Sequence, residues 1–291
     1  MKLKQTAIAL GLTLTCSAPA MALTITTTTD GSAMASALLS SGSGLTISNV
    51  SYTGATNQGG YFTGAGSAIG IDSGIILTSG NATDAVGPNS LDNTSTNLGT
   101  SGDADLTSIV GVSTNDANVL EFDFTTTTGD LFFKYVFASE EYNEYVGNFN
   151  DPFAFLLDGV NIAIVPGSTD AVTVDNVNCG QSYAPPNGGT NCFLFNNNDP
   201  SDGGPFFDIE YDGFTDVFTA SATGLSSGTH HIKLAIADAS DSALDSAVFL
   251  EAGSFSATDP GSPGNNVPEP VSLALVGIGL AGLVASRRRK A

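Results

Sequence analysis

Between residues 23 and 255 the sequence is divided into about a dozen short apolar runs, separated by clusters of Gly, Ser, Thr, Asn and Asp. Several runs alternate between apolar and polar residues, which is the period of a half-buried strand. Only the segment from Asp30 to Ser40 has the capping residue and apolar content of a helix. The pattern predicts an all-β fold: a single jelly-roll-like β-sandwich with one short N-terminal helix, spanning residues 23–258.

The predicted strands are short and are bounded by turn residues, and the Gly-rich segment 59–70 between two of them is interpreted as a turn. Residues 81–118 are polar throughout and predict a long surface excursion, a kind of loop that is often functional. The strands are expected at residues 23–28, 45–53, 74–78, 119–124, 131–138, 153–157, 161–165, 172–177, 206–211, 216–222, 230–237 and 247–255.

The charge of the chain is strongly negative and unevenly distributed. Among 291 residues there are 29 acidic and 8 basic side chains, a formal net charge of -21. Between Leu23 and Val267 lie all the acids except Glu269, 29 − 1 = 28, against only Lys134 and Lys233, a charge of -26. Nucleic acid is excluded as a partner because phosphate binding needs Lys and Arg. Metal cations are the natural partners, and a hydrophobic content of 41% argues against disorder.

The N-terminus, residues 1–22, has the three parts of a secretory signal peptide. Lys2 and Lys4 precede an apolar stretch at residues 7–14, and Ala20 and Ala22 occupy the two positions that signal peptidase reads. The protein is therefore expected to be exported. Lipoprotein processing at Cys16 is the alternative, although the residues before it fit a lipobox poorly.

After removal of the signal peptide two cysteines remain, Cys179 and Cys192. An even number in an exported protein predicts a disulfide, here across a Pro- and Gly-rich loop. Two free thiols are the alternative. No Cys-x-x-Cys motif or Cys/His cluster indicates zinc.

The C-terminus is also divided into parts. A polar linker at residues 259–266 precedes a short Pro-Glu-Pro motif, an apolar run at residues 271–285 and a basic tail at residues 287–290. As a helix the apolar run measures about 22 Å, less than the ~30 Å hydrocarbon core, so it spans a membrane only with local thinning. The basic tail is expected to stay cytoplasmic, which leaves the β domain outside.

This tail resembles the PEP-CTERM protein-sorting signal. The resemblance implies recognition by an exosortase, a membrane protease of Gram-negative bacteria that also make exopolysaccharide. The protein is then expected to pass through an inner-membrane intermediate before it reaches the cell surface or the extracellular space. The residues that carry the resemblance are Val267, Pro268, Glu269 and Pro270, the transmembrane helix 271–285, and Arg287, Arg288 and Arg289.

The preceding domain resembles the choice-of-anchor L domain over residues 23–255. The similarity is carried by residues 74–81, 135–151 and 235–255. This family is named for its occurrence with varied surface anchors. The resemblance implies an extracellular domain and assigns no activity, so the function must be inferred from the residues.

Two acidic clusters follow apolar runs and predict a calcium site. In antiparallel β domains the loops of separate hairpins gather at one end, so the clusters could meet. Calcium takes six to eight oxygen ligands from carboxylates, amides, carbonyls and water. An acidic surface exposed to solvent is the alternative. The candidate ligands are Glu140, Glu141 and Asp151 in the first cluster and Asp238, Asp241 and Asp245 in the second.

We therefore expect a non-enzymatic surface or matrix protein of a biofilm, with a calcium-stabilised sandwich. Two alternatives remain: an exopolysaccharide-binding, lectin-like module, and a secreted glycan hydrolase that uses two carboxylates as acid and base. No Gly-x-Ser-x-Gly motif or Cys/His pair indicates a catalytic nucleophile.

Overall fold

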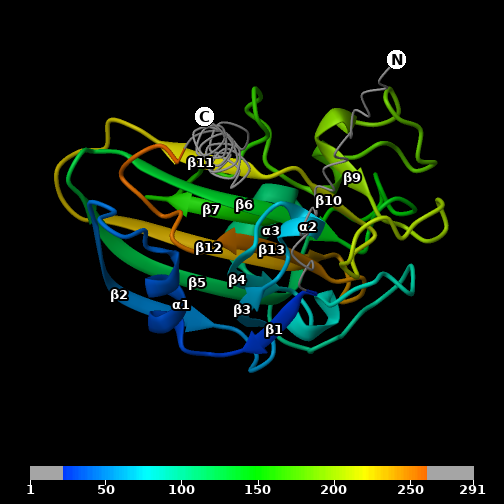
Figure 1. The fold of residues 1–291 in the computed structure, drawn as a ribbon, viewed down its shortest axis with the longest axis horizontal. Coiled ribbons are helices and arrows are strands. Elements are labelled where there is room, and N and C mark those ends of the chain that lie inside the picture. The colour runs from blue at the N-terminus through cyan, green and yellow to red at the C-terminus, as the bar shows by residue number, and fades with distance from the viewer. Residues whose placement is uncertain (1–21, 261–291) are drawn as a thin grey trace, which may run out of the picture.

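The computed structural model describes residues 22–260, which contain two antiparallel β-sheets packed face to face (Figure 1). One sheet has eight strands in the order β1-β3-β4-β13-β6-β10-β9, with β11 also paired to β6, and the other has five in the order β2-β5-β12-β7-β8. The predicted all-β sandwich is confirmed. The strands are β1 (Thr24–Thr27), β2 (Leu45–Thr53), β3 (Gly59–Thr63), β4 (Ser73–Thr78), β5 (Thr114–Thr126), β6 (Leu131–Ser139), β7 (Phe153–Leu157), β8 (Val160–Asn161), β9 (Phe195–Asn197), β10 (Gly213–Thr215), β11 (Phe218–Ala222), β12 (His230–Ala239) and β13 (Ser246–Glu251).

Strand β6 lies at the centre of the larger sheet because it is apolar on both faces. Phe133, Tyr135 and Phe137 point into the space between the sheets, while Val136 and Ala138 belong to a second apolar cluster on the opposite face. Aromatic rings fill the space between the sheets in edge-to-face contacts, a geometry that adds to the free energy of burial.

Short helices pack both against the core between the sheets and against the outer faces of the sheets. The predicted N-terminal helix is present as α1 (Gly31–Leu38), capped by Asp30. It is joined by α2 (Gly66–Ile69) and α3 (Ala104–Val110), and by the 3-10 turns η1 (Ala82–Ala85), η2 (Val174–Asn176) and η3 (Cys192–Leu194). Apolar residues of α2 and η1 belong to the cluster on the outer face of the eight-stranded sheet, and those of α3 to the cluster on the five-stranded sheet.

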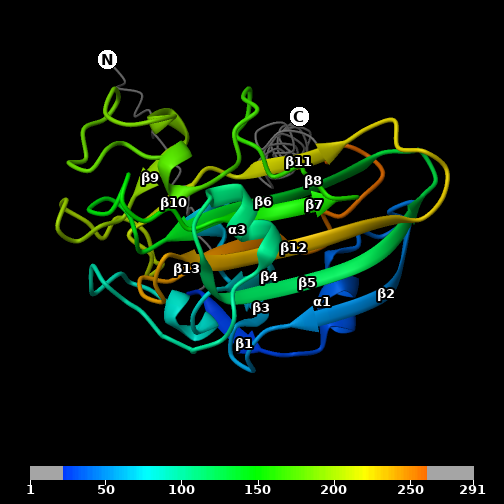
Figure 2. The ribbon, with the colours of Figure 1, turned by 180° about the vertical axis from the view of Figure 1, so that it is seen from behind.

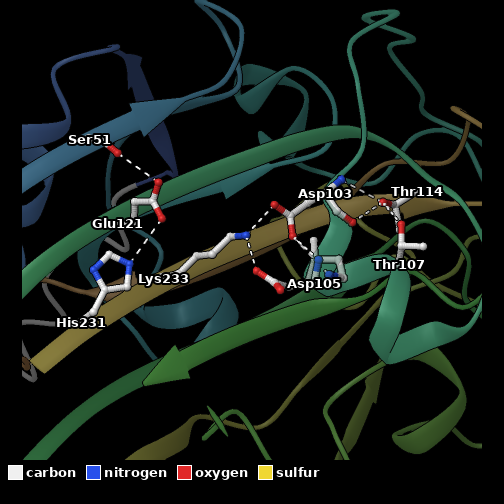
Figure 3. A network of polar contacts seen from close by, with 9 residues as sticks. Ser51, Asp103, Asp105, Thr107, Thr114, Glu121, His231 and Lys233 are labelled. Carbon is white, nitrogen blue, oxygen red and sulfur yellow. Dashed lines mark hydrogen bonds and ion pairs between the residues drawn. The ribbon is translucent and has the colours of Figure 1, made fainter. Parts of the chain in front are cut away.

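The contact between α3 and the five-stranded sheet is also electrostatic. The Lys233 Nζ atom on β12 donates to carboxylates of Asp103, the N-cap of α3, at 2.6 Å and of Asp105 at 2.7 Å (Figure 3). Nearby, His231 lies between Glu121 and Asp123 on the neighbouring strand β5. These contacts of Lys233 hold α3, which belongs to the polar excursion at residues 81–118, against the outer face of the five-stranded sheet.

Several predicted elements are wrong in detail. The predicted turn at residues 59–70 contains strand β3 and helix α2, and the predicted strand at 161–165 is reduced to β8. The predicted strands at 172–177 and 206–211 form no ladder; in these segments backbone pairing is limited to isolated bridges at Thr173 and Ile209. Apart from the exposed Phe206, their large apolar side chains are buried in the core or packed against it, although the backbone forms no ladder there.

The predicted disulfide is confirmed. Cys179 and Cys192 are bonded, with their Cα atoms 4.5 Å apart, and both are buried. Among residues 22–260 no helix is long and apolar enough to cross a membrane. The predicted signal peptide up to Met21, with Ala20, and the predicted sorting motif, transmembrane helix and basic tail lie outside the described residues.

Candidate functional site

The two predicted acidic clusters meet at one end of the sandwich. This end carries β9 and β10, and the loops after β6 and β12 gather there (Figure 1; at left in Figure 2). Ser139 at the end of β6 pairs with Ser246 at the start of β13. The backbone N–H of Glu140 donates to the carbonyl of Asp245 at 3.1 Å. Strand pairing between residues more than 100 positions apart therefore places the first cluster against the second.

Asp151 links two strands at this end of the sandwich. Its Oδ1 accepts from the Ala239 N–H at 2.8 Å and its Oδ2 from the Ser246 hydroxyl at 2.7 Å, so both oxygens are satisfied. Burial raises the pKa of Asp151 to about 7, against the opposing effect of these hydrogen bonds. This carboxylate ties β12 to β13.

Four other predicted carboxylates are buried and incompletely paired. Glu140, Glu141, Asp238 and Asp245 are each at most 2% exposed. The oxygens of Glu140 and Asp238 accept no hydrogen bond of normal geometry, although the Thr94 backbone and the Ser79 side chain approach them closely enough to lower their pKa values against the effect of burial. One oxygen of Glu141 and one of Asp245 are likewise unpaired. An unpaired buried polar group costs about 1–3 kcal/mol, and a charged one more. These oxygens therefore require a proton or a cation.

Burial is the largest cause of the raised pKa values of the same four carboxyl groups. It raises the pKa of Asp238 to about 10, of Glu141 to about 9 and of Asp245 to about 7, and neighbouring carboxylates add to each increase. The pKa of Glu140 is also raised well above its ordinary value, by burial first and then by the charge of Asp212.

Asp241 differs from the other predicted ligands. It is exposed, and its Oδ1 accepts from the Ala243 N–H within its own turn. Its charge nevertheless contributes to the raised pKa values of Glu141 and Asp151. It lies at the rim of the buried group.

The cationic side chains of residues 22–260 are occupied elsewhere. Lys134 lies 3.9 Å from Glu251, and Lys233 binds the N-terminal end of α3. His230 binds Asp158, and His231 binds the acids of β5. In the described part of the chain no ion pair involves the six predicted ligands.

The excursion at residues 81–118 crosses this end and supplies hydrogen-bond donors to it. The Thr96 N–H donates to Asp245 Oδ2 at 2.9 Å, and the Thr94 hydroxyl to Glu210 at 2.7 Å. The Leu98 N–H donates to the buried Asp116 at 3.0 Å. The loop therefore covers the buried carboxylates, and its functional role stays a prediction.

Gly80 lies where no side chain fits. A Cβ atom at this position would overlap the carboxylate of Asp245. The backbone before the excursion therefore approaches that carboxylate directly.

Sequence reasoning missed two aspartates, Asp199 and Asp212, which form a second acidic group beside the first. Asp199 and Asp212 are fully buried, and Glu144 lies against them. The run Asn196-Asn197-Asn198-Asp199, which precedes this group, was an available signal because amides and carboxylates are metal and turn ligands. Across residues 22–260, no three Asp, Glu, His or Cys side chains are already arranged to hold one metal ion. A bound cation would thus need amide, carbonyl or water oxygens as well.

The fold and the tail together define the class: an exported two-sheet β-sandwich domain joined to a C-terminal sorting signal. The choice-of-anchor L domain matches residues 24–256, so the chain belongs to this family. The PEP-CTERM protein-sorting motif matches residues 266–290. The protein is therefore an exported cell-surface protein that is processed by exosortase. Comparison with curated proteins and with solved structures gives no significant match.

Proposed function

We propose that this protein is a non-enzymatic component of the cell surface or extracellular matrix, and that calcium bound at the acidic end stabilises its sandwich. The observation that carries the proposal is the complete burial of Asp238 and Glu140 with all four carboxylate oxygens unpaired. The other ligands come from Glu141, Asp241 and Asp245, with Asp151 as the anchor that holds the strands in place.

A cation resolves the electrostatic problem better than protons alone. Several carboxylates would each have to be neutralised, and the pKa of Asp245, about 7, leaves it substantially ionised at neutral pH. No Lys or His among residues 22–260 pairs with this group. A divalent ion supplies two positive charges at the point where desolvation is strongest.

Calcium fits the donor set better than magnesium. Calcium accepts six to eight oxygens in irregular geometry, whereas magnesium requires a near-ideal octahedron and retains several waters. The available donors are carboxylates and backbone carbonyls of loops, and among the described residues fewer than three acids converge on one point. Such a site is completed by water and by carbonyl oxygens.

The burial of these acids also argues against catalysis. A general acid or base must reach the substrate, and five of the six carboxylates are buried beneath the excursion and the strand ends. A groove of about 640 Å³ beside β10, β11 and α2 is lined mainly by neutral residues, with Asp216 as its one acid. It offers no pair of carboxylates.

Calcium is therefore expected to raise the melting temperature of residues 23–260. Extracellular sites often have Kd values of order 10⁻⁴ to 10⁻³ M, so millimolar calcium should stabilise the fold by roughly 1 kcal/mol. Magnesium at equal ionic strength controls for screening, and Asp245→Ala should remove the shift. Equal stabilisation by magnesium, or a full calcium shift in Asp245→Ala, would show that there is no specific calcium site and that protons alone neutralise the buried acids.

The route to the surface can be tested separately. The tail is expected to hold the protein in the inner membrane until exosortase removes it and the domain is released. Cell fractionation and mass spectrometry of the C-terminus should find the released form without Arg287 in the wild type, and the membrane form with it in an exosortase-null strain. A mature protein that keeps its tail in both strains would mean a permanent anchor.

A further inference from the structure

The second acidic group is built by a hairpin that brings two aspartates together. Strand β9 pairs with β10, with Asn197 opposite Gly213. The backbone N–H of Asn198 donates to the carbonyl of Asp212 at 2.7 Å. Asp199 and Asp212 therefore lie side by side just beyond the end of the ladder, and both are fully buried.

Glu144 joins them from the loop after β6. Its Oε1 accepts from the Ser201 hydroxyl at 2.9 Å, and its backbone carbonyl accepts from the Gln181 side chain at 3.0 Å. The charge of Asp199 acts on Glu144, and the charges of both act on Asp212. The three carboxyl groups thus form one mutually repelling set.

Each of these carboxylates is satisfied at one oxygen and unpaired at the other. Asp212 Oδ1 accepts from the Asn89 amide at 2.6 Å, and Asp199 Oδ1 from the Ser201 N–H at 2.6 Å. The second oxygens of Asp199, Asp212 and Glu144 are buried and accept from no N–H or O–H donor, and the Glu144 and Asp199 carboxyl groups lie close enough to share a proton. The side-chain amide oxygens of Asn89 and Asn143 are likewise buried without a partner. Five oxygen acceptors are therefore left unpaired, against one unpaired donor, the Nδ2 atom of Asn197.

Such a set has the composition of a hard-cation site. Three carboxylate and two amide oxygens are ligands that calcium accepts, and the neighbouring loops can adjust to its irregular geometry. Burial, reinforced by Asp199 and Glu144, raises the pKa of Asp212 to about 9, which is the electrostatic cost that a cation would remove.

We propose that Glu144, Asp199 and Asp212, with the amide oxygens of Asn89 and Asn143, form a second calcium site. It joins the hairpin β9–β10 to the loop after β6 and to the covering excursion. None of its carboxylates is among the six ligands of the first site, so it does not depend on the proposed function. Since the three carboxylates do not yet converge on one point, binding is expected to tighten the segment 198–212.

Calcium titration of oxidised residues 23–260 tests the proposal, because both sheets are built entirely from this range. Calorimetry in 0.15 M salt should detect two calcium ions. Hydrogen exchange should show calcium-dependent protection at 198–212. The double variant Asp199→Asn/Asp212→Asn should lose one ion and this protection. The matched control is Asp208→Asn, an exposed acid of the same segment.

The outcomes separate the two sites. If the double variant still binds two ions, or if Asp208→Asn loses as much binding, the second site is refuted. If the wild type binds one ion that only Asp238→Asn removes, the second site fails and the first survives. If only the double variant removes that ion, the second survives. Glu144→Gln, at a partly exposed position, gives the same test should the double variant not fold; unchanged binding would refute the site.

Discussion

Replacing Asp238 by Asn should stabilise the protein in the absence of calcium and reduce the further stabilisation that calcium gives. Asp238 lies near the end of β12, is fully buried and has two unpaired oxygens. Asparagine has nearly the same shape and carries no charge. The variant therefore removes the cost of burying a carboxyl group and leaves the packing of the strand intact.

The magnitude follows from the difference in pKa between the two states. Without a cation, Asp238 is protonated in the folded state at pH 7, because its pKa is raised from 3.8 to about 10, but ionised in the unfolded state. Each pH unit above 3.8 then lowers the free energy of unfolding by about 1.36 kcal/mol. At pH 7 the loss reaches roughly 4 kcal/mol, an upper limit for the gain in the variant, since the new amide needs partners of its own.

The difference in stability between Asp238→Asn and the wild type depends on pH and on calcium. The raised pKa favours the folded state at low pH, and this contribution is lost as pH rises from 3.8 toward 10. The two proteins should therefore be about equally stable at pH 4, and the variant more stable at pH 7 in chelator. In millimolar calcium the wild type gains a ligand-dependent term that the variant lacks, so the difference should shrink or reverse.

Urea unfolding followed by far-UV circular dichroism measures this difference, since the chain has no Trp. Asp241→Asn is the matched control: it makes the same change three residues further on, at an exposed position in the loop after β12, so the stability of this variant should equal that of the wild type in chelator. If Asp238→Asn is less stable than the wild type in chelator at pH 7, the carboxyl group has a compensating partner and the reasoning is refuted.

Three further changes test the rest of the structure. Replacing Cys179 and Cys192 by Ala should lower the free energy of unfolding by about 3 kcal/mol, the value for a closed loop of this size, as measured by urea unfolding; an unchanged midpoint would contradict it. The hydrogen bond to Asp158 raises the pKa of His230. The stabilisation by protonated His230 is lost as pH rises through its folded-state pKa, so His230→Gln should be more destabilising at pH 5.5 than at pH 8.5. A stability difference that does not depend on pH would exclude the ion pair. Lys233→Met should destabilise the fold by about 1 kcal/mol and speed hydrogen exchange in α3, whereas exchange unchanged in α3 would mean that apolar packing alone holds the helix.

The sequence was sufficient for properties that depend on local pattern. Short alternating runs predicted the sandwich, and Asp30 marked the start of α1. The cysteine pair in an exported chain predicted the disulfide. Local pattern failed at β3, where Gly59 and Gly60 indicated a turn. There a Cβ atom at Gly60 would overlap the backbone of β1, so glycine is required by the close approach of two strands.

Pattern also failed where apolar residues are buried without strand pairing. Val172, Val174 and Val177 read as a strand, yet they pack into the core from a segment that contains the 3-10 turn η2. Burial and backbone pairing give the same apolar signal in a sequence, and only the neighbouring elements decide between them.

The acid excess, the even pair of exported cysteines and the sorting tail were determined by the sequence alone, because composition and linear motifs are independent of folding. Tertiary structure decided which carboxylates are buried. Asp241 is exposed, whereas Asp238, three residues away, is fully buried. Asp199 lies next to Asp212 only because β9 and β10 form a hairpin. Burial depends on chain segments that are distant in sequence, and it is burial that turns an acidic residue into one that requires a proton or a cation.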